Sequence, residues 1–318
     1  MHLLITALLF ALGVLLIVKG GDWFVDAATW MAEITGIPKF IIGATIVSLA
    51  TTLPELIVSA MASLDGKVDM AIGNAVGSVI ANTGLILAIS LIAMAGRVAK
   101  RQFNVKACLL IIACVALWLG CRSGGLTLPD SVLVGIVFLA YIIENIVKTR
   151  EIVADDVTGV AAATTAQKSE LPVQLFHFVA GTIGIVVGAR LLVDNGSELA
   201  RILGVPENII ALTFVAIGTS LPELVTTLTA IIKRQSSLSV GNIVGANIID
   251  MTMILPVCAA LSGGTLPVGA QTIAIDLPAA LTVSLVALVP PLITERFYRW
   301  QGFALLAVYA AYLAIILF

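Results

Sequence analysis

Two short segments place a glutamate directly after a proline in the middle of apolar runs. They are residues 51–55 (TTLPE) and 219–223 (TSLPE). A proline lacks the backbone N–H, so a helix through it would leave a carbonyl free one turn earlier, near Ala50 and Gly218. A helix broken there would present carboxylate, hydroxyl and carbonyl oxygens together. Hard cations such as Na⁺ and Ca²⁺ prefer such oxygen shells, so the two segments predict a cation site.

A second pair of segments follows the first pair by about 20 residues. They are residues 73–82 (GNAVGSVIAN) and 241–250 (GNIVGANIID). Glycines four positions apart let two helices approach closely. The i,i+4 spacing places polar side chains on one helix face, namely Asn74, Ser78 and Asn82 in the first segment and Asn242 and Asp250, with Ala246 between them, in the second. A lone Asn or Ser could serve helix–helix hydrogen bonding alone, but two matched stripes favour a binding site.

The negative charge of the predicted site limits which ions it can transport. Glu55, Glu223 and Asp250 together carry up to three negative charges, which a site of low dielectric tolerates only when cations or protons offset them. One Ca²⁺ would leave one charge for a proton or a monovalent ion, whereas three Na⁺ would balance all three. One acidic cluster that serves two cargoes in turn is the electrostatic basis of an exchanger.

The composition indicates that these segments lie in a membrane. Of the 318 residues, 60% are hydrophobic and only 11% are charged, with a mean hydropathy of +1.12, whereas a soluble domain has about 25% charged residues. The 17 Lys and Arg do not exceed the 19 Asp and Glu, so no basic surface for nucleic acid is expected. We therefore expect a multi-pass protein of the cell membrane, surrounded by the lipid bilayer, that needs no cofactor.

Ten apolar windows are long enough to cross a bilayer. They fall at about 3–27, 38–64, 68–95, 103–121, 130–148, 172–200, 206–232, 238–261, 270–293 and 301–318. The polar stretch 149–171 separates residues 1–148, with spans 1–5, from residues 172–318, with spans 6–10. The expected fold class is an all-α polytopic membrane protein of ten transmembrane helices, of which helices 2, 3, 7 and 8 are broken.

The two halves are related by an internal repeat. When the chain is shifted by 168 residues, 22 of the 63 positions from 20 to 82 match without a gap. Five spans in each half is an odd number, so the two halves enter the membrane from opposite sides. Such inverted repeats are typical of secondary transporters, whose substrate site lies near the midplane between the repeats.

The basic residues predict the orientation. Twelve of the 17 Lys and Arg lie on the side of the 149–171 linker and three on the other side. By the excess of Lys and Arg in cytoplasmic loops, the linker is cytoplasmic and both termini are outside.

The doubled TTLPE/TSLPE and GNxVG segments resemble the two α-repeats of the calcium/cation antiporter superfamily, sodium/calcium exchanger type. The resemblance implies a secondary antiporter that exchanges Na⁺ for Ca²⁺ by alternating access. Central Ca²⁺ ligands would be Glu55 and Glu223, completed by Asn82 and Asp250. Thr51, Thr52 and Ser78 would form an inner Na⁺ position, and Thr219, Ser220 and the Ala216 carbonyl an outer one. Ser48 and Asn247 complete the candidate set.

The chain departs from the family pattern at several positions. It has Ala50 where the family's first motif begins with Gly, and Ala246 where a hydroxyl is frequent. The segment from Asp250 to Pro256 is similar to the potassium-dependent branch, so K⁺ transport stays open. We expect the protein to work as a monomer.

Three other functions are alternatives to the exchange of Na⁺ for Ca²⁺. The nearest alternative is a proton/calcium exchanger of the same superfamily, but its binding helices typically carry an acid where this chain has Gly77. An intramembrane hydrolase would need partners for His2 or His177, or a pair of aspartates, and would leave the duplicated glutamates unexplained. A passive cation channel would show flux that needs no counter-ion. We expect a transporter and not an enzyme.

Charged residues outside these motifs have simpler interpretations. Lys19, Asp22 and Asp26 are spaced to pair with one another on the first span. Glu144 and Asp276 are weaker candidates for the ion path.

Overall fold

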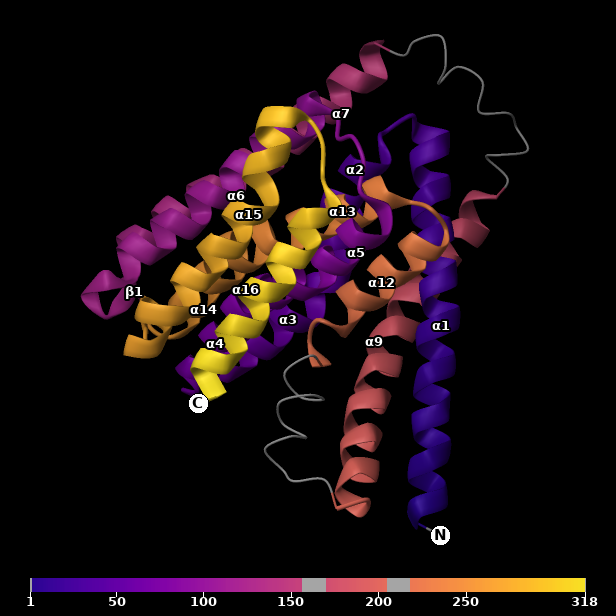
Figure 1. Ribbon diagram of the computed structural model, residues 1–318, viewed down its shortest axis with the longest axis horizontal. Helices are drawn as coiled ribbons and strands as arrows, with labels where there is room; N and C mark the ends of the chain where they lie inside the picture. Colours follow the sequence, from indigo (N-terminus) through magenta and orange to yellow (C-terminus); the bar gives the residue numbers. More distant parts are fainter. Residues whose placement is uncertain (1, 156–169, 205–217, 318) are drawn as a thin grey trace.

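A computed structural model describes residues 2–155, 170–204 and 218–317 of the chain (Figure 1). Across these residues nine helices are long and apolar enough to cross a membrane. The seventh predicted span, 206–232, lies partly outside the described residues, and its described part is α12 (Leu221–Ile232). The prediction of an all-helical polytopic protein is confirmed, and the multi-pass membrane character follows from these helices.

The first half contains five membrane-length helical stretches. Their bounds are α1 His2–Thr35; α2 Lys39–Ile42, η1 Gly43–Val47 and α3 Ser48–Leu64; α4 Val68–Ala81, η2 Asn82–Leu87 and α5 Ala88–Met94; α6 Lys100–Gly120, followed by the short η3 Cys121–Ser123; and α7 Leu128–Asp155. Helix α7 therefore continues seven residues into the stretch predicted as linker, 149–171.

The described residues of the second half contain four membrane-length helical stretches and the shorter helix α12. Its helices are α9 Leu171–Ile202; α12; α13 Ser236–Ile249, η6 Asp250–Ile254 and α14 Leu255–Leu261; η7 Thr272–Asp276 and α15 Leu277–Thr294; and α16 Arg299–Leu317. The segments η1, η2, η6 and η7 are π-helical turns inside otherwise continuous helices. Such turns occur frequently at functional sites.

Three of the four spans that were predicted to be broken are continuous helices in the structure. Spans 2, 3 and 8 run without interruption over Lys39–Leu64, Val68–Met94 and Ser236–Leu261, and Pro54 lies inside α3. That part of the prediction is wrong for these three spans. A proline removes one hydrogen bond, but neighbouring helices can hold the chain helical around it, and the irregularity takes the form of a π-helical turn in each span.

Helices α1 and α9 lie side by side and antiparallel at one edge of the molecule (Figure 1). Their glycines let the backbones touch. A Cβ on Gly20 would lie 2.9 Å from the carbonyl oxygen of Gly181, and a Cβ on Gly13 would lie 3.0 Å from that of Gly188. Small residues are what close packing of membrane helices requires, so these four glycines set the contact between the two helices.

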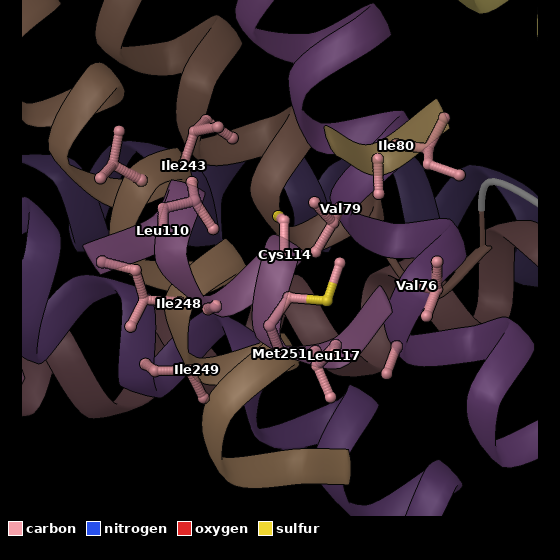
Figure 2. Close-up of a cluster of buried hydrophobic side chains, with 14 of the residues drawn as sticks. Val76, Val79, Ile80, Leu110, Cys114, Leu117, Ile243, Ile248, Ile249 and Met251 are labelled. Carbon is pink, nitrogen blue, oxygen red and sulfur yellow. The ribbon is translucent and has the colours of Figure 1, made fainter. Parts of the chain in front are cut away.

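The main core surrounds α13, in which every residue from Leu238 to Ile249 is buried. Figure 2 shows apolar side chains of α4, α6 and α13 meeting there, among them Val79, Leu110 and Ile248. A helix that is buried on all sides can hold polar groups away from lipid. The polar residues of the 241–250 segment are therefore positioned by a rigid central element.

Two short antiparallel pairings tie loops of the two halves together at opposite ends of α6. Strand β1 (Gly125–Thr127) pairs with β2 (Thr265–Pro267), with Leu126 opposite Leu266. At the other end Arg97 lies opposite Arg296 in a single bridge.

A buried glutamine compensates for two prolines near the end of α15. Pro290 and Pro291 cannot donate to the carbonyls four residues earlier, those of Val286 and Ala287. The Nε2 of Gln301, on α16, donates to these two carbonyl oxygens at 2.9 and 3.0 Å. The Gln301 side chain is fully buried, so the two carbonyls are satisfied without water.

Gln301→Leu should lower the free energy of unfolding by about 2–4 kcal/mol, because it leaves two buried carbonyls without a donor. Unfolding by denaturant titration of the purified protein in detergent measures this. Exposed Gln271→Leu is the control and should change little. Adding Pro290→Ala and Pro291→Ala to the Gln301 variant restores two backbone donors, so stability should recover in part. A Gln301→Leu variant as stable as the parent would contradict this role.

Candidate ion-binding site

Glu55 and Glu223 enter the site from corresponding helices. Glu55 lies in α3 and Glu223 in the first turn of α12, and their exposed fractions are 1% and 0%. None of their four carboxylate oxygens has a hydrogen-bond partner in the described residues. Buried carboxylates without partners are strongly unfavourable, so these two glutamates are candidates for binding a cation.

Asn82 and Asp250 each begin a π-helical turn. Asn82 is the first residue of η2 and Asp250 the first of η6, and both are buried. Both carboxylate oxygens of Asp250 and the amide oxygen of Asn82 lack partners within the described chain. With the glutamates, seven buried oxygens are thus free to accept a cation.

The three carboxylates are close enough to repel one another. Glu55 interacts electrostatically with both Glu223 and Asp250, and Asp250 interacts with Glu223. However, no three acidic, histidine or cysteine side chains of the described residues converge enough to hold a metal ion by themselves. A cation here would therefore share one or two carboxylates with amide, hydroxyl and carbonyl oxygens, as hard cations do.

Hydroxyl and amide side chains join the two halves around the carboxylates. Ser220 Oγ donates to Ser78 Oγ at 3.3 Å. Thr51 Oγ1 donates to the amide oxygen of Asn242 at 3.2 Å, and Asn82 Nδ2 donates to the amide oxygen of Asn247 at 3.2 Å. Each of these three hydrogen bonds joins a buried side chain of the first half to one of the second half.

The remaining candidate ligands differ in their hydrogen bonds and in their burial. Ser48 Oγ donates to the carbonyl of Thr45, and Thr52 Oγ1 donates to that of Ser48, at 3.1 and 2.6 Å. Both side chains are buried and keep acceptor lone pairs. Thr219, in the turn before α12, is half-buried. Ala216 lies outside the described residues.

Thr83, Thr226 and Asn242, which the motif-based prediction left out of the candidate set, take part in hydrogen bonds beside it. Asn242 donates to Thr226 Oγ1 at 3.0 Å, and Asn247 donates to Thr83 Oγ1 at 2.7 Å. All four side chains are buried. Thr226 lies three residues after Glu223, so helix periodicity could have found it, whereas Thr83 directly follows Asn82 and no periodic signal points to it.

Comparison with known sequences and solved structures identifies the family of this chain. The family model described as "Sodium/calcium exchanger protein" matches residues 5–147 and 173–318. This chain belongs to the sodium/calcium exchanger family. The sodium–calcium exchanger NCX_Mj, in a structure soaked with Na⁺ and Sr²⁺, superposes with a TM-score of 0.81 at 30% identity, covering 98% of this chain and 99% of that one.

Two curated relatives cover most of this exchanger-family chain. The inner membrane protein YrbG of Escherichia coli is 35% identical over 268 residues, 82% of this chain and 81% of its own. The sodium/calcium exchanger MaX1 of Methanosarcina acetivorans is 27% identical over 348 residues, 98% of each chain. A human sodium/potassium/calcium exchanger matches only 26% of this chain, so the resemblance to the potassium-dependent branch is partial. Membership in a transporter family confirms that the chain is not an enzyme.

Charged residues outside the ion site of this exchanger-family member serve packing. Lys106 forms a buried ion pair with Glu144, so Glu144 is neutralised there. Lys233 bridges Asp22 and Asp26 at 3.3 and 2.8 Å. The predicted pairing of these two aspartates with Lys19 is therefore corrected: helix α1 is tied to the end of α12 by Lys233.

Proposed function

We propose that this protein is a secondary antiporter that exchanges Na⁺ for Ca²⁺ across the membrane. The observation that carries the proposal is a set of seven buried oxygens, on Glu55, Asn82, Glu223 and Asp250, that have no hydrogen-bond partner among the residues that the structure describes. Oxygen ligands of mixed charge suit Ca²⁺ and Na⁺, and the family membership agrees with transport of these ions.

Charge balance couples the two ions. With Glu55, Glu223 and Asp250 ionised, the site is too negative to remain empty inside the membrane. One Ca²⁺ or several Na⁺ relieve the same repulsion, so the site accepts one cargo only after the other has left. Alternating access of a cation-filled site then produces exchange, since an empty site crosses the membrane unfavourably.

Na⁺ would use the neutral oxygens around the carboxylates. Thr51, Thr52, Ser48 and Ser78 form the proposed inner position. Thr219, Ser220 and the carbonyl of Ala216 form the proposed outer one, with the amide of Asn247 between the halves. The contact of Ser220 with Ser78 supports two positions that share a border.

The proposed architecture is two inverted repeats, residues 1–148 and 172–318, joined by the segment 149–171. Three observations support it. The glycine contacts of α1 with α9 exchange partners under the 168-residue shift, since Gly13 and Gly20 correspond to Gly181 and Gly188. The turns η2 and η6 begin 168 residues apart. The two loop pairings join corresponding loops at opposite ends of α6.

The proposed orientation has both termini outside and residues 149–171 in the cytoplasm, in a protein that works as a monomer. Single cysteines placed at positions 160 and 264 of a cysteine-free variant test it. A membrane-impermeant thiol reagent applied to whole cells should label position 264 and spare position 160. The reverse pattern would overturn the orientation.

Transport into vesicles tests the function. In vesicles containing the purified protein, an outward Na⁺ gradient should drive Ca²⁺ uptake without a pH gradient. Uptake that follows a pH gradient and ignores Na⁺ would instead indicate the proton/calcium exchanger. Flux that needs no counter-ion would indicate a channel.

Asp250→Asn should change the ion coupling more than the fold. Position 82, its counterpart, already holds an amide, so the geometry tolerates one, and the site loses one negative charge. Fewer monovalent cations are then needed to balance it, and Ca²⁺ binds more weakly because an amide oxygen is a poorer ligand than a carboxylate. Ca²⁺ affinity and Na⁺ and K⁺ activation measured from pH 6 to 9 decide this. Unchanged curves would mean that Asp250 carries no charge that matters to transport.

A further inference from the structure

The loop that joins α5 to α6 brings two arginines face to face with no acid between them. Arg97 is the partner of Arg296 in the antiparallel bridge to the α15–α16 loop. The flanking hydrogen bonds run from Val98 N to the Glu295 carbonyl at 3.0 Å and from Phe297 N to the Gly96 carbonyl at 2.8 Å. In this non-hydrogen-bonded kind of pair, the two Cα atoms are about 4.5 Å apart and the side chains leave on the same face.

Directly opposed like charges destabilise a strand pair, so this arrangement needs a reason. Both arginines are exposed, and no carboxylate of the described residues pairs with either of them. The adjacent Glu295 is already paired with Lys100 at 3.5 Å. Lys100 begins α6, where a positive charge is also unfavourable next to the helix N-terminus. An anion between the two guanidinium groups would relieve the repulsion between the arginines.

The other end of the molecule provides an internal comparison. The β1–β2 pairing joins the corresponding loops there, and Thr265 lies 168 residues after Arg97. Thr265 is opposite Thr127, which lies 169 residues before Arg296. The same crossing is thus built with two neutral threonines at one end, so the fold does not require arginines. The presence of the two arginines at the other end therefore indicates that a ligand binds on that side of the molecule.

The position of the pair identifies the anion. Arg97 and Arg296 lie in loops between membrane-length helices, at the level where these helices end. Arg296 lies over the ring of Tyr298, 5.8 Å from its centroid, and this ring stacks on Trp300, which is 55% exposed. Exposed Tyr and Trp at span ends are typical of the membrane interface. Paired guanidinium groups bind phosphate oxygens in a bidentate manner.

We infer that Arg97 and Arg296 form a binding site for the phosphodiester of an anionic phospholipid in the adjacent leaflet. Phe297 is buried and its ring packs edge-on against Phe103 at 5.5 Å, so the loop that presents Arg296 is anchored in the core. The site therefore presents its two charges from a fixed backbone. It lies on the side proposed to be cytoplasmic, where juxtamembrane basic residues meet anionic headgroups.

Titration of the purified full-length protein in neutral detergent with phosphatidylglycerol tests the site, with bound lipid counted by native mass spectrometry. The double variant Arg97→Thr/Arg296→Thr copies the pairing of the other end and should fold. It should bind phosphatidylglycerol about tenfold to thirtyfold more weakly, since each basic residue near an anionic surface contributes roughly fivefold. Arg97→Lys/Arg296→Lys, which keeps the charge but loses bidentate geometry, should bind with intermediate affinity.

Three outcomes would overturn the inference. The first is a double Thr variant that binds phosphatidylglycerol as the parent does. The second is an equal loss of phosphatidylglycerol binding in Arg122→Thr. Arg122 is an exposed arginine before β1 at the other end of the molecule, so an equal loss would mean that the effect is not specific to the arginine pair. The third is competition by inorganic phosphate or binding of phosphatidylcholine with the affinity of phosphatidylglycerol, since the site would then not recognise an anionic lipid. If the double variant does not fold, the single variants Arg97→Thr and Arg296→Thr should each lose about fivefold. Lipid binding is read without transport, so this result is independent of the exchange assay.

Discussion

Glu55→Gln and Glu223→Gln should each abolish Ca²⁺ transport in reconstituted vesicles while the protein stays folded. Each change keeps the shape of the side chain and removes one negative charge from a buried group that has no hydrogen-bond partner in the described part of the chain. The lost attraction to a divalent cation is on the order of several kcal/mol, which is more than 100-fold in Ca²⁺ affinity. Transport should fall below the detection limit at Ca²⁺ concentrations that saturate the parent.

The stability of these variants separates a binding role from a structural one. Without Ca²⁺ and Na⁺, removal of one charge relieves the repulsion among Glu55, Glu223 and Asp250, so each variant should be at least as stable as the parent. Ca²⁺ should stabilise the parent against heat and leave the variants unchanged. Exposed Glu33→Gln is the matched control and should transport normally. Exchange at the parent rate in either site variant would remove that glutamate from the proposed site.

Gly241→Ala should destabilise the protein by about 2–4 kcal/mol and eliminate most of the transport. A Cβ at position 241 would overlap the carbonyl oxygen of Phe40 and lie 3.1 Å from the backbone N of Ala44. Backbone atoms cannot move away by changing rotamer as a side chain can, so α13 would have to move away from α2 and η1. Asn242 is the next residue and bonds to Thr51, so the displacement would open the ion site.

Gly135→Ala provides the control for this change. Gly135 lies in α7, and a Cβ there meets no described atom within 4 Å. Helical Ala is favoured over Gly by about 1 kcal/mol, so this variant should be neutral or slightly stabilised. Thermal unfolding in detergent and Ca²⁺ uptake in vesicles measure both variants. Equal behaviour of the two would mean that the contact between α13 and η1 does not hold the site.

The sequence alone determined the membrane character and nine of the ten helix positions in the described residues, and it predicted the repeat and the central acids of the proposed site. These features depend on information that is local or periodic along the chain. Hydropathy over about 20 residues reports a span because the bilayer has a fixed thickness. A carboxylate such as Glu55 or Glu223 inside an apolar run is informative because its cost in lipid must be offset by function.

Only the tertiary structure decided which polar atoms have partners. The motifs place Asn242 and Asn247 on α13 alike, but contacts across helices decide that Asn242 bonds to Thr51 and Thr226, and Asn247 to Asn82 and Thr83. These contacts join residues more than 160 positions apart in three of the four cases, so no local pattern contains them.

The form of the helix irregularities was likewise a tertiary property. A proline at position 54 predicts a break from local chemistry, but the chain stays helical there and the π-helical turns begin at Gly43, Asn82 and Asp250. Packing against neighbouring helices outweighs the single hydrogen bond that Pro54 removes. The partner of Asp22 and Asp26 was decided in the same way, since Lys233 is distant in sequence and reaches them only because α12 packs on α1.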